Sequence, residues 1–180
     1  MTRDAIGLVD HAASASSTLM IKAGSVFGVV ISASLTLTMA SFTDAAEPII
    51  GQATVIDGDT IEVRGQRIRL AGMDAFETRQ SCQDSDGKAY RCGRDAAFAL
   101  DALIGRRNVT CEPSGKNWDR IVAVCSVNGR DLGGWMVRQG HAVDDDRYDP
   151  SYLWSEVIAR WTARGAWSGS FERPRDWRSR

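Results

Sequence analysis

The sequence has little of several features that often point to a function. It contains only two histidines, and His141 stands beside an expected helix end, where capping or packing is a better interpretation than catalysis. Its four cysteines include no C-x-x-C pair, which argues against a zinc site. There is no internal repeat, and 180 residues is a length typical of one domain.

A net positive charge is also missing. Of 22 basic and 23 acidic residues, two and three respectively lie in residues 1–45, which leaves 20 of each in the rest. No global basic field therefore attracts nucleic acid. However, 18 of those 20 cations are arginine, whose planar fork suits bidentate contacts with phosphate, so any steering must be local.

Charge is absent altogether between Ala23 and Ala40. Lys22 precedes this run, and small residues at 43 and 45 suit a signal peptidase. Residues 1–45 are therefore predicted to be a signal peptide, with Met20 as an alternative start. A membrane anchor is disfavoured, because the apolar core is shorter than the ~20 residues of a spanning helix. We expect a periplasmic or secreted protein, without choosing between the two, and no stable membrane association after cleavage.

All four cysteines follow the expected cleavage site, as in exported proteins with disulfides. Three pairings are possible, and we expect the nearest neighbours to pair. Cys82–Cys92 would then close a polar loop, and Cys111–Cys125 would join two strands.

Hydrophobic patterns predict an α+β fold. Residues 51–71 alternate apolar and polar around a turn at 64–66, which is typical of a β-hairpin. Helical spacing predicts a helix over 94–104 that ends at Gly105. Further expected elements are strands at 107–112 and 121–127, a short helix from its cap Asp131 to Gln139, and a last helix from Pro150, capped by Asp149, to Gly165. This order suits a small antiparallel barrel of the OB type with appended helices.

The last helix and the residues after it differ in pattern. Leu153, Val157 and Trp161 form one stripe, widened by Trp154 and Ile158, so we expect the helix and its tryptophans to pack on the barrel. The tail at 168–180 contains arginine and proline without a period, and is expected to drape over the surface or to fray.

Acidic residues and glycine are disfavoured in strands, yet Asp57-Gly58-Asp59 falls inside the first expected strand. If the hairpin turns at Gly65-Gln66, Asp57 lies across from Asp74 and Asp59 across from Gly72, which gathers three carboxylates. Such hard oxygen ligands suit calcium or magnesium. A bulge with a solvated Asp-Gly turn would explain the same residues, and the spacing alone does not decide.

Arg69 precedes this acidic cluster and Glu77 follows it. Phosphodiester hydrolysis needs charge neutralisation on the phosphoryl oxygens, a positioned water, and a group that accepts or orients its proton. A cation, metal ligands and a base thus lie close together in the sequence. Taken singly, Arg69 is better explained as a surface partner of Glu62 across the hairpin.

The segments VIDGDTIEV, RIRLAGMDAFET, WDRIVAVC and MVRQGHA together resemble the staphylococcal nuclease (thermonuclease) family in order, spacing and residue type. The resemblance covers residues 51–167, and we expect one such domain over 46–167 followed by the tail. It implies an α+β fold, a five-stranded OB-type barrel with about three helices. It also implies an endonuclease that acts on DNA or RNA and leaves 5′-hydroxyl and 3′-phosphate ends, which we expect to be a monomer.

The resemblance further implies the roles of particular residues. Asp59, Asp74 and the backbone carbonyl of Ala75 would hold a calcium ion, with Asp57 as a possible further ligand and magnesium as the second choice. Glu77 would activate or orient the attacking water, while Arg69 and Arg120 would grip the scissile phosphate. The aromatic candidates for substrate contact are Trp118, which could stack on a base although burial in the core is the commoner fate of a tryptophan, and Tyr148.

Three departures from the family pattern favour alternatives. Asp119 adjoins Arg120 and could pair with it, Asp144–Asp146 would repel phosphate, and Phe76 replaces a proline that would stiffen the bend before Glu77. The chain could therefore be a nucleic-acid-binding module without activity. A weaker alternative is a disulfide-stapled structural or protein-binding OB domain, which would bind without the salt dependence of phosphate contacts.

Overall fold

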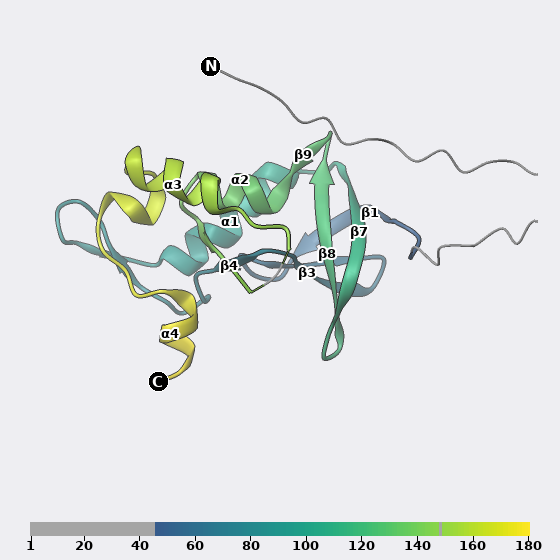
Figure 1. Ribbon diagram of the computed structural model, residues 1–180, viewed down its shortest axis with the longest axis horizontal. Coiled ribbons are helices and arrows are strands. Elements are labelled where there is room, and N and C mark those ends of the chain that lie inside the picture. The colour runs from purple at the N-terminus through teal and green to yellow at the C-terminus, as the bar shows by residue number, and fades with distance from the viewer. Residues whose placement is uncertain (1–45, 148) are drawn as a thin grey trace, which may run out of the picture. The chain divides into compact units, whose positions relative to one another are not determined.

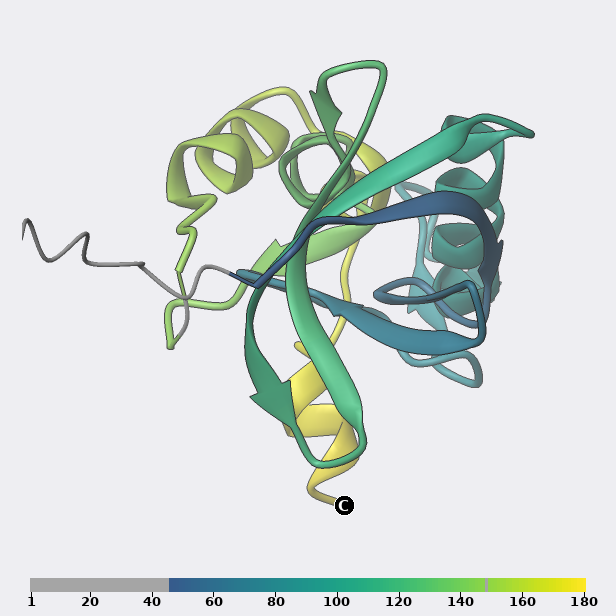
Figure 2. The ribbon, with the colours of Figure 1, turned by 90° about the vertical axis from the view of Figure 1, so that its right-hand side faces the viewer.

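The computed structural model describes residues 46–147 and 149–180, and the expected signal peptide lies outside them. Five strands form a closed barrel in the order β3-β2-β1-β7-β8, and the parallel pair β3–β8 closes it. Figure 2 shows these strands curving around a common centre. Their bounds are β1 Ile49–Val55, β2 Thr60–Val63, β3 Gln66–Leu70, β7 Asn108–Asn117 and β8 Arg120–Val127. The α+β fold and the five-stranded barrel are thus confirmed.

The hairpin expected at 51–71 is in fact three strands. β1 and β2 pair with each other, and the tight loop between them contains Asp57, Gly58 and Asp59. The carboxylate of Asp57 accepts a hydrogen bond from the Asp59 amide at 3.0 Å, which stabilises the loop. A Cβ at Gly58 would lie 2.7 Å from that of Ala75, so only glycine lets the loop approach β4 (Met73–Ala75) so closely. The prediction that this acidic segment lies inside a strand was wrong.

The predicted register between β2 and β3 was wrong by two residues. The turn between β2 and β3 consists of Arg64 and Gly65, both with positive φ (52° and 75°), rather than Gly65-Gln66. Such two-residue turns match the twist of the strands they join. As a result, the carbonyl oxygen of Asp59 accepts a hydrogen bond from the amide of Leu70 at 2.8 Å, and Asp59 does not face Gly72.

Helices and disulfides complete the core. α1 (Cys92–Ile104) buries Ala96, Leu100 and Ile104 against the barrel and ends at Gly105, as the sequence predicts. Cys111–Cys125 joins β7 to β8, and Cys82–Cys92 joins β5 (Cys82–Gln83) to the start of α1. β6 (Ala89–Tyr90) pairs with β5, and β9 (Arg130–Asp131) extends the sheet beyond β8. Both expected disulfide pairings are confirmed.

Of the two helices predicted after β8, one begins where the sequence predicts and the other does not. α2 (Leu132–Arg138) begins where expected, because the Asp131 carboxylate accepts hydrogen bonds from the amides of Gly133 and Gly134. α3 begins later than predicted and spans Leu153–Trp161, with Tyr152 rather than Asp149 before it.

The buried face of α3 also differs from the prediction. Trp154 and Trp161 are 77% and 87% exposed, whereas Glu156 and Ala159 are buried. The helix has apolar residues of its own on several sides, so its sequence pattern did not identify the buried face. The small Ala159 permits close packing, and Glu156 is acceptable inside because it binds Arg173 and the Asp144 amide.

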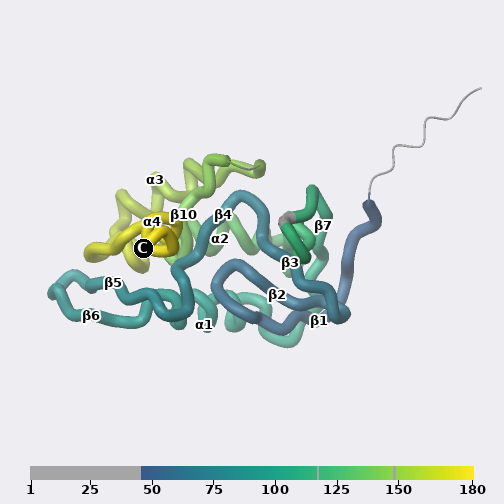
Figure 3. Tube along the Cα trace, turned by 90° about the horizontal axis from the view of Figure 1, so that it is seen from below, coloured from purple at the N-terminus to yellow at the C-terminus, as the bar shows by residue number. Residues whose placement is uncertain are grey.

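The C-terminal tail is draped along the molecule. After the short 3₁₀ turn η1 (Gly165–Ser168), Ser170 and Gln83 exchange two backbone hydrogen bonds of 2.8 and 3.1 Å. The ring of Phe171 then packs edge-on against Phe76, at 5.1 Å between centroids. A fourth helix, α4 (Pro174–Arg178), follows and contacts β4, which pairs with β10 (Ala142–Asp144) (Figures 1 and 3).

No helix in the described ranges is both long and apolar enough to cross a membrane.

Candidate active site

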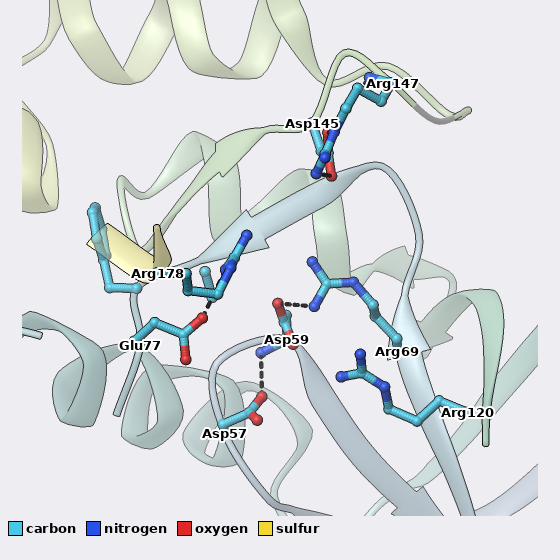
Figure 4. Close-up of a pocket in the computed structure, with 10 residues that line it drawn as sticks. Asp57, Asp59, Arg69, Glu77, Arg120, Asp145, Arg147 and Arg178 are labelled. Atoms are coloured by element: carbon cyan, nitrogen blue, oxygen red, sulfur yellow. Dashed lines mark hydrogen bonds and ion pairs between the residues drawn. The ribbon is translucent and has the colours of Figure 1, made fainter. Parts of the chain in front are cut away.

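Residues from six parts of the chain line one cavity of about 390 Å³ beside the barrel (Figure 4). They come from the β1–β2 loop, β3, β4 and the bend after it, the start of β8, the loop after β10, and α4. The lining residues are Asp57, Asp59, Arg69, Ala75, Phe76, Glu77, Arg120, Asp145, Arg147 and Arg178. The structure therefore brings together most of the residues that the sequence singled out.

Arg69 lies between two buried carboxylates. Its Nη1 is 2.5 Å from Asp59 Oδ2 and its Nη2 is 3.0 Å from Asp74 Oδ1, with the arginine side chain only 15% exposed. Burial opposes its charge, but Asp59 and Asp74 outweigh that effect and raise the pKa of Arg69 above its usual value. Glu62 pairs in register with Arg67 instead, so the surface-partner interpretation of Arg69 was wrong.

The two carboxylates fit a hard divalent cation. Asp59 and Asp74 bind the two ends of one guanidinium group, so both carboxylates face the same small region. The pKa of Asp59 is raised to about 6, mainly by burial; nearby Asp57 and Asp74 also raise this pKa, and Arg69 lowers it. Within the described ranges no three His, Cys, Asp or Glu side chains gather as a metal cluster. A cation here would therefore need backbone oxygen and water as well, which calcium and magnesium accept.

Asp57 stabilises the loop that carries Asp59 and does not bind Arg69. One of its carboxylate oxygens accepts the Asp59 amide hydrogen bond, while the side chain still borders the cavity. A turn is therefore present at Asp57-Gly58, but it is not the solvated turn that the sequence offered as an alternative, because Gly58 and Asp59 are buried. It holds Asp59 in place, and it leaves Asp57 as a neighbour of the carboxylate pair.

Arg120 opens β8 and presents its guanidinium group to the cavity below Arg69 (Figure 4). Among residues 46–147 and 149–180 this guanidinium group has no hydrogen-bond or ion-pair partner. The adjacent Asp119 is exposed and does not bind it, so the ion pair that the sequence suggested between these neighbours does not form. Arg120 can therefore bind an anion in the cavity without first breaking an ion pair.

Glu77 is held by its backbone and by the tail. Its amide donates to Gln80 Oε1 at 3.1 Å, and a Cβ at Gly93 would lie 1.7 Å from its carbonyl oxygen, so α1 packs directly against the bend. Phe76, which is 2% exposed, packs on Phe171. Packing and hydrogen bonds thus supply the rigidity that a proline at position 76 would give.

Only part of the Asp144–Asp146 run reaches the cavity. Asp144 binds the amide of Tyr152, and Asp146 is exposed and lines a neighbouring pocket instead of the cavity. Asp145 is buried and accepts hydrogen bonds from Arg147 Nε and Nη2 at 2.8 and 2.9 Å. Although burial acts in the opposite direction, Arg147 lowers the pKa of Asp145, so its charge is retained but paired. The run is therefore not the uniform repulsive patch that its sequence suggests.

The aromatic candidates lie elsewhere. Trp118 occupies the tip of the β7–β8 hairpin with a positive φ of 59° and is 93% exposed, so the interpretation as a buried residue was wrong. It does not line the cavity, and its stacking role stays a prediction. Tyr148 lies outside the described residues. His141 stacks on Trp135 at 6.0 Å, in agreement with a packing role.

Two cavity residues were missed by the sequence reasoning. Arg147 follows the acidic run, and its sequence neighbours gave no sign that it would bind Asp145. Arg178 lies in the aperiodic tail, yet it donates to Asp74 at 2.8 and 3.0 Å and to Glu77 at 2.7 Å. Only the excess of arginine in that tail could have drawn attention to it.

The structure is a small OB-type barrel with a cavity that arginine and carboxylate side chains line together, an arrangement compatible with a nuclease-like domain. Residues 67–169 match the family described as Staphylococcal nuclease homologue. The chain is also 42% identical, over 144 residues, to the Succinoglycan biosynthesis protein ExoI of Rhizobium meliloti (strain 1021), covering 78% of this chain and 74% of that protein. The chain therefore belongs to the staphylococcal nuclease family. The family match begins after Asp59 and ends before α4.

Proposed function

We propose that the protein is an exported, calcium-dependent endonuclease that hydrolyses DNA or RNA and leaves 5′-hydroxyl and 3′-phosphate ends. Membership of the nuclease family supports hydrolysis of phosphodiester bonds. The observation that carries the proposal is that Arg69, Glu77 and Arg120 line one cavity with Asp59, while Asp74 binds Arg69. The two disulfides support a function in an oxidising compartment.

The proposed residues divide the reaction among them. Bound calcium, held by Asp59, Asp74 and the Ala75 carbonyl, would supply positive charge beside the phosphoryl oxygens. Arg120 binds a non-bridging oxygen of the phosphate, and Arg69 adds a second positive charge from β3. These donors stabilise the charge that grows on the phosphoryl group as water attacks.

Glu77 orients the attacking water. Its Oε1 accepts from Arg178, whereas its Oε2 has no hydrogen-bond partner among the described residues and can accept a proton from water. The new bond joins the water oxygen to phosphorus, and the bond from phosphorus to O5′ breaks. O5′ then takes a proton from solvent, so the products are a 3′-phosphate and a 5′-hydroxyl.

The relative's name refers to succinoglycan biosynthesis, which raises a polysaccharide as a second possible substrate. The cavity of this chain combines arginines with carboxylates, the groups that phosphodiester hydrolysis needs. We therefore keep nucleic acid as the proposed substrate, and succinoglycan serves as a comparison substrate.

Cleavage of single-stranded DNA by the oxidised protein tests these roles. We expect Arg120→Ala and Glu77→Gln each to lower kcat by roughly 100-fold or more, as for loss of a transition-state donor or a general base. Arg130→Ala is the matched control, because Arg130 is exposed on β9 and lies outside the cavity. Full activity in either cavity variant contradicts the assigned role, whereas DNA binding without cleavage by the wild type favours the inactive binding module.

A further inference from the structure

α4 delivers Arg178 to carboxylates that the proposed reaction needs. Nη1 of Arg178 lies 3.0 Å from Asp74 Oδ1 and 2.7 Å from Glu77 Oε1, and its Nη2 lies 2.8 Å from Asp74 Oδ2. Arg69 also donates to Asp74 Oδ1, so both oxygens of Asp74 accept hydrogen bonds from guanidinium groups. Forked pairs of this kind are among the strong contacts of a carboxylate.

The chain just before α4 is firmly attached. The fully buried Gln80 donates through Nε2 to the carbonyl oxygen of Glu172 at 2.7 Å. Arg173 donates to both carboxylate oxygens of the buried Glu156, at 3.0 and 3.1 Å. Pro174, the first residue of α4, is buried. These contacts fix where the helix starts and therefore aim Arg178 at the cavity.

The other end of α4 is held mainly by charge. Pro174 is the single buried residue of this five-residue helix, and Arg175 and Asp176 are exposed. Trp177 is half-buried and belongs to neither of the two hydrophobic core clusters. The side chain of Arg178 is 36% exposed. Withdrawal of the helix end would therefore break ion pairs without opening the hydrophobic core.

We propose that α4 is an autoinhibitory element in which Arg178 competes with a divalent cation for Asp74 and Glu77. This inference rests on the function proposed above, since it takes Asp74 as a cation ligand and Glu77 as the group that orients water. A cation on Asp74 and a guanidinium group on the same oxygens repel each other, so each weakens the binding of the other. Arg178 therefore sets the calcium concentration at which the site fills, and its withdrawal also frees Glu77 Oε1.

Calorimetric titration with calcium, in the absence of nucleic acid, tests the competition in the full-length oxidised protein. We expect Arg178→Gln to lower the calcium Kd by roughly tenfold. The control is Arg180→Gln, which removes one positive charge from the same end of the chain but breaks only the pair with Glu172. We expect its Kd to stay within about twofold of the wild type, because exposed charges are screened. A Kd for Arg178→Gln that equals the control or exceeds the wild type overturns the proposal.

Cleavage kinetics separate this inference from the proposed function. At limiting calcium we expect Arg178→Gln to cleave single-stranded DNA faster than the wild type. If the wild type binds calcium and cleaves DNA but Arg178→Gln binds calcium no more tightly, the nuclease proposal stands and the autoinhibitory one falls. If neither protein binds calcium, both proposals fail. A lower rate for Arg178→Gln at saturating calcium would make Arg178 a positioning residue for Glu77 and would overturn inhibition.

Discussion

The two arginines of the cavity that face the proposed phosphate position differ in what they do for the folded protein. Arg69 neutralises Asp59 and Asp74, which are 7% and 3% exposed, whereas Arg120 has no partner among the described residues. Breaking a buried charge pair leaves its other members uncompensated and costs far more than removing an unpaired surface charge. Their contributions to stability should therefore be separable from their contributions to catalysis.

We predict that Arg69→Ala lowers the free energy of unfolding by about 3 kcal/mol in calcium-free buffer at neutral pH. Arg120→Ala should change it by less than about 0.5 kcal/mol, as for other substitutions outside the core. Urea denaturation followed by circular dichroism measures both values. Equal stability of the two variants would show that Arg69 is not the partner that compensates the buried carboxylates.

At the scale of elements, the two disulfides support different parts of the molecule. Cys111–Cys125 lies within the barrel wall, and neither cysteine lines the cavity. Cys82–Cys92 joins β5 to α1 and flanks Gln80 and Gly93, which hold the backbone of Glu77. The first bridge should therefore matter for stability alone, and the second for stability and activity.

We predict that replacing either cysteine pair by alanines lowers the free energy of unfolding by about 3 kcal/mol, the cost expected for loops of this size. Assayed below its melting temperature, the Cys111→Ala/Cys125→Ala protein should keep its kcat, while the Cys82→Ala/Cys92→Ala protein should lose activity because Glu77 is less well held. The same kcat in both variants would show that the Cys82–Cys92 disulfide is not needed to hold Glu77 in position.

The tip of the β7–β8 hairpin carries the aromatic residue that we propose to stack on a base of the substrate strand. Trp118 is 93% exposed at its tip, so replacing it removes no core packing. We predict that Trp118→Ala weakens binding of single-stranded DNA by roughly five- to tenfold, as for loss of one base stack, with unchanged thermal stability. Fluorescence anisotropy with a labelled oligonucleotide measures the affinity, and Trp161→Ala on the exposed face of α3 is the matched control. Equal affinities for the two variants would show that Trp118 does not contact the substrate.

At the scale of the whole molecule, local signals predicted much of the fold. The Asp131 cap, the Gly105 helix end and the cysteine spacing each depend on nearby residues, and each was confirmed. The register of β2 and β3 was not predicted, because it depends on which two residues form the turn. The buried face of α3 was missed because its apolar residues do not distinguish inside from outside.

The candidate site shows the same limit more sharply. Arg69, Glu77 and Arg120 could be found from the order of short segments, and all three line the cavity. Arg178 could not, because no local pattern says that a segment about 100 residues after Asp74 returns to it. That contact depends on the path of the tail across β5, Phe76 and α3, which only the three-dimensional structure reveals.

The function proposed for this cavity is calcium-dependent hydrolysis of phosphodiester bonds. The most direct measurement is mass spectrometry of the products from a single-stranded DNA oligonucleotide, incubated with the folded, oxidised protein in calcium or in chelator. We predict cleavage in calcium alone, with fragments that carry 3′-phosphate and 5′-hydroxyl ends. An intact oligonucleotide in the presence of calcium, or fragments with 5′-phosphate ends, would contradict it.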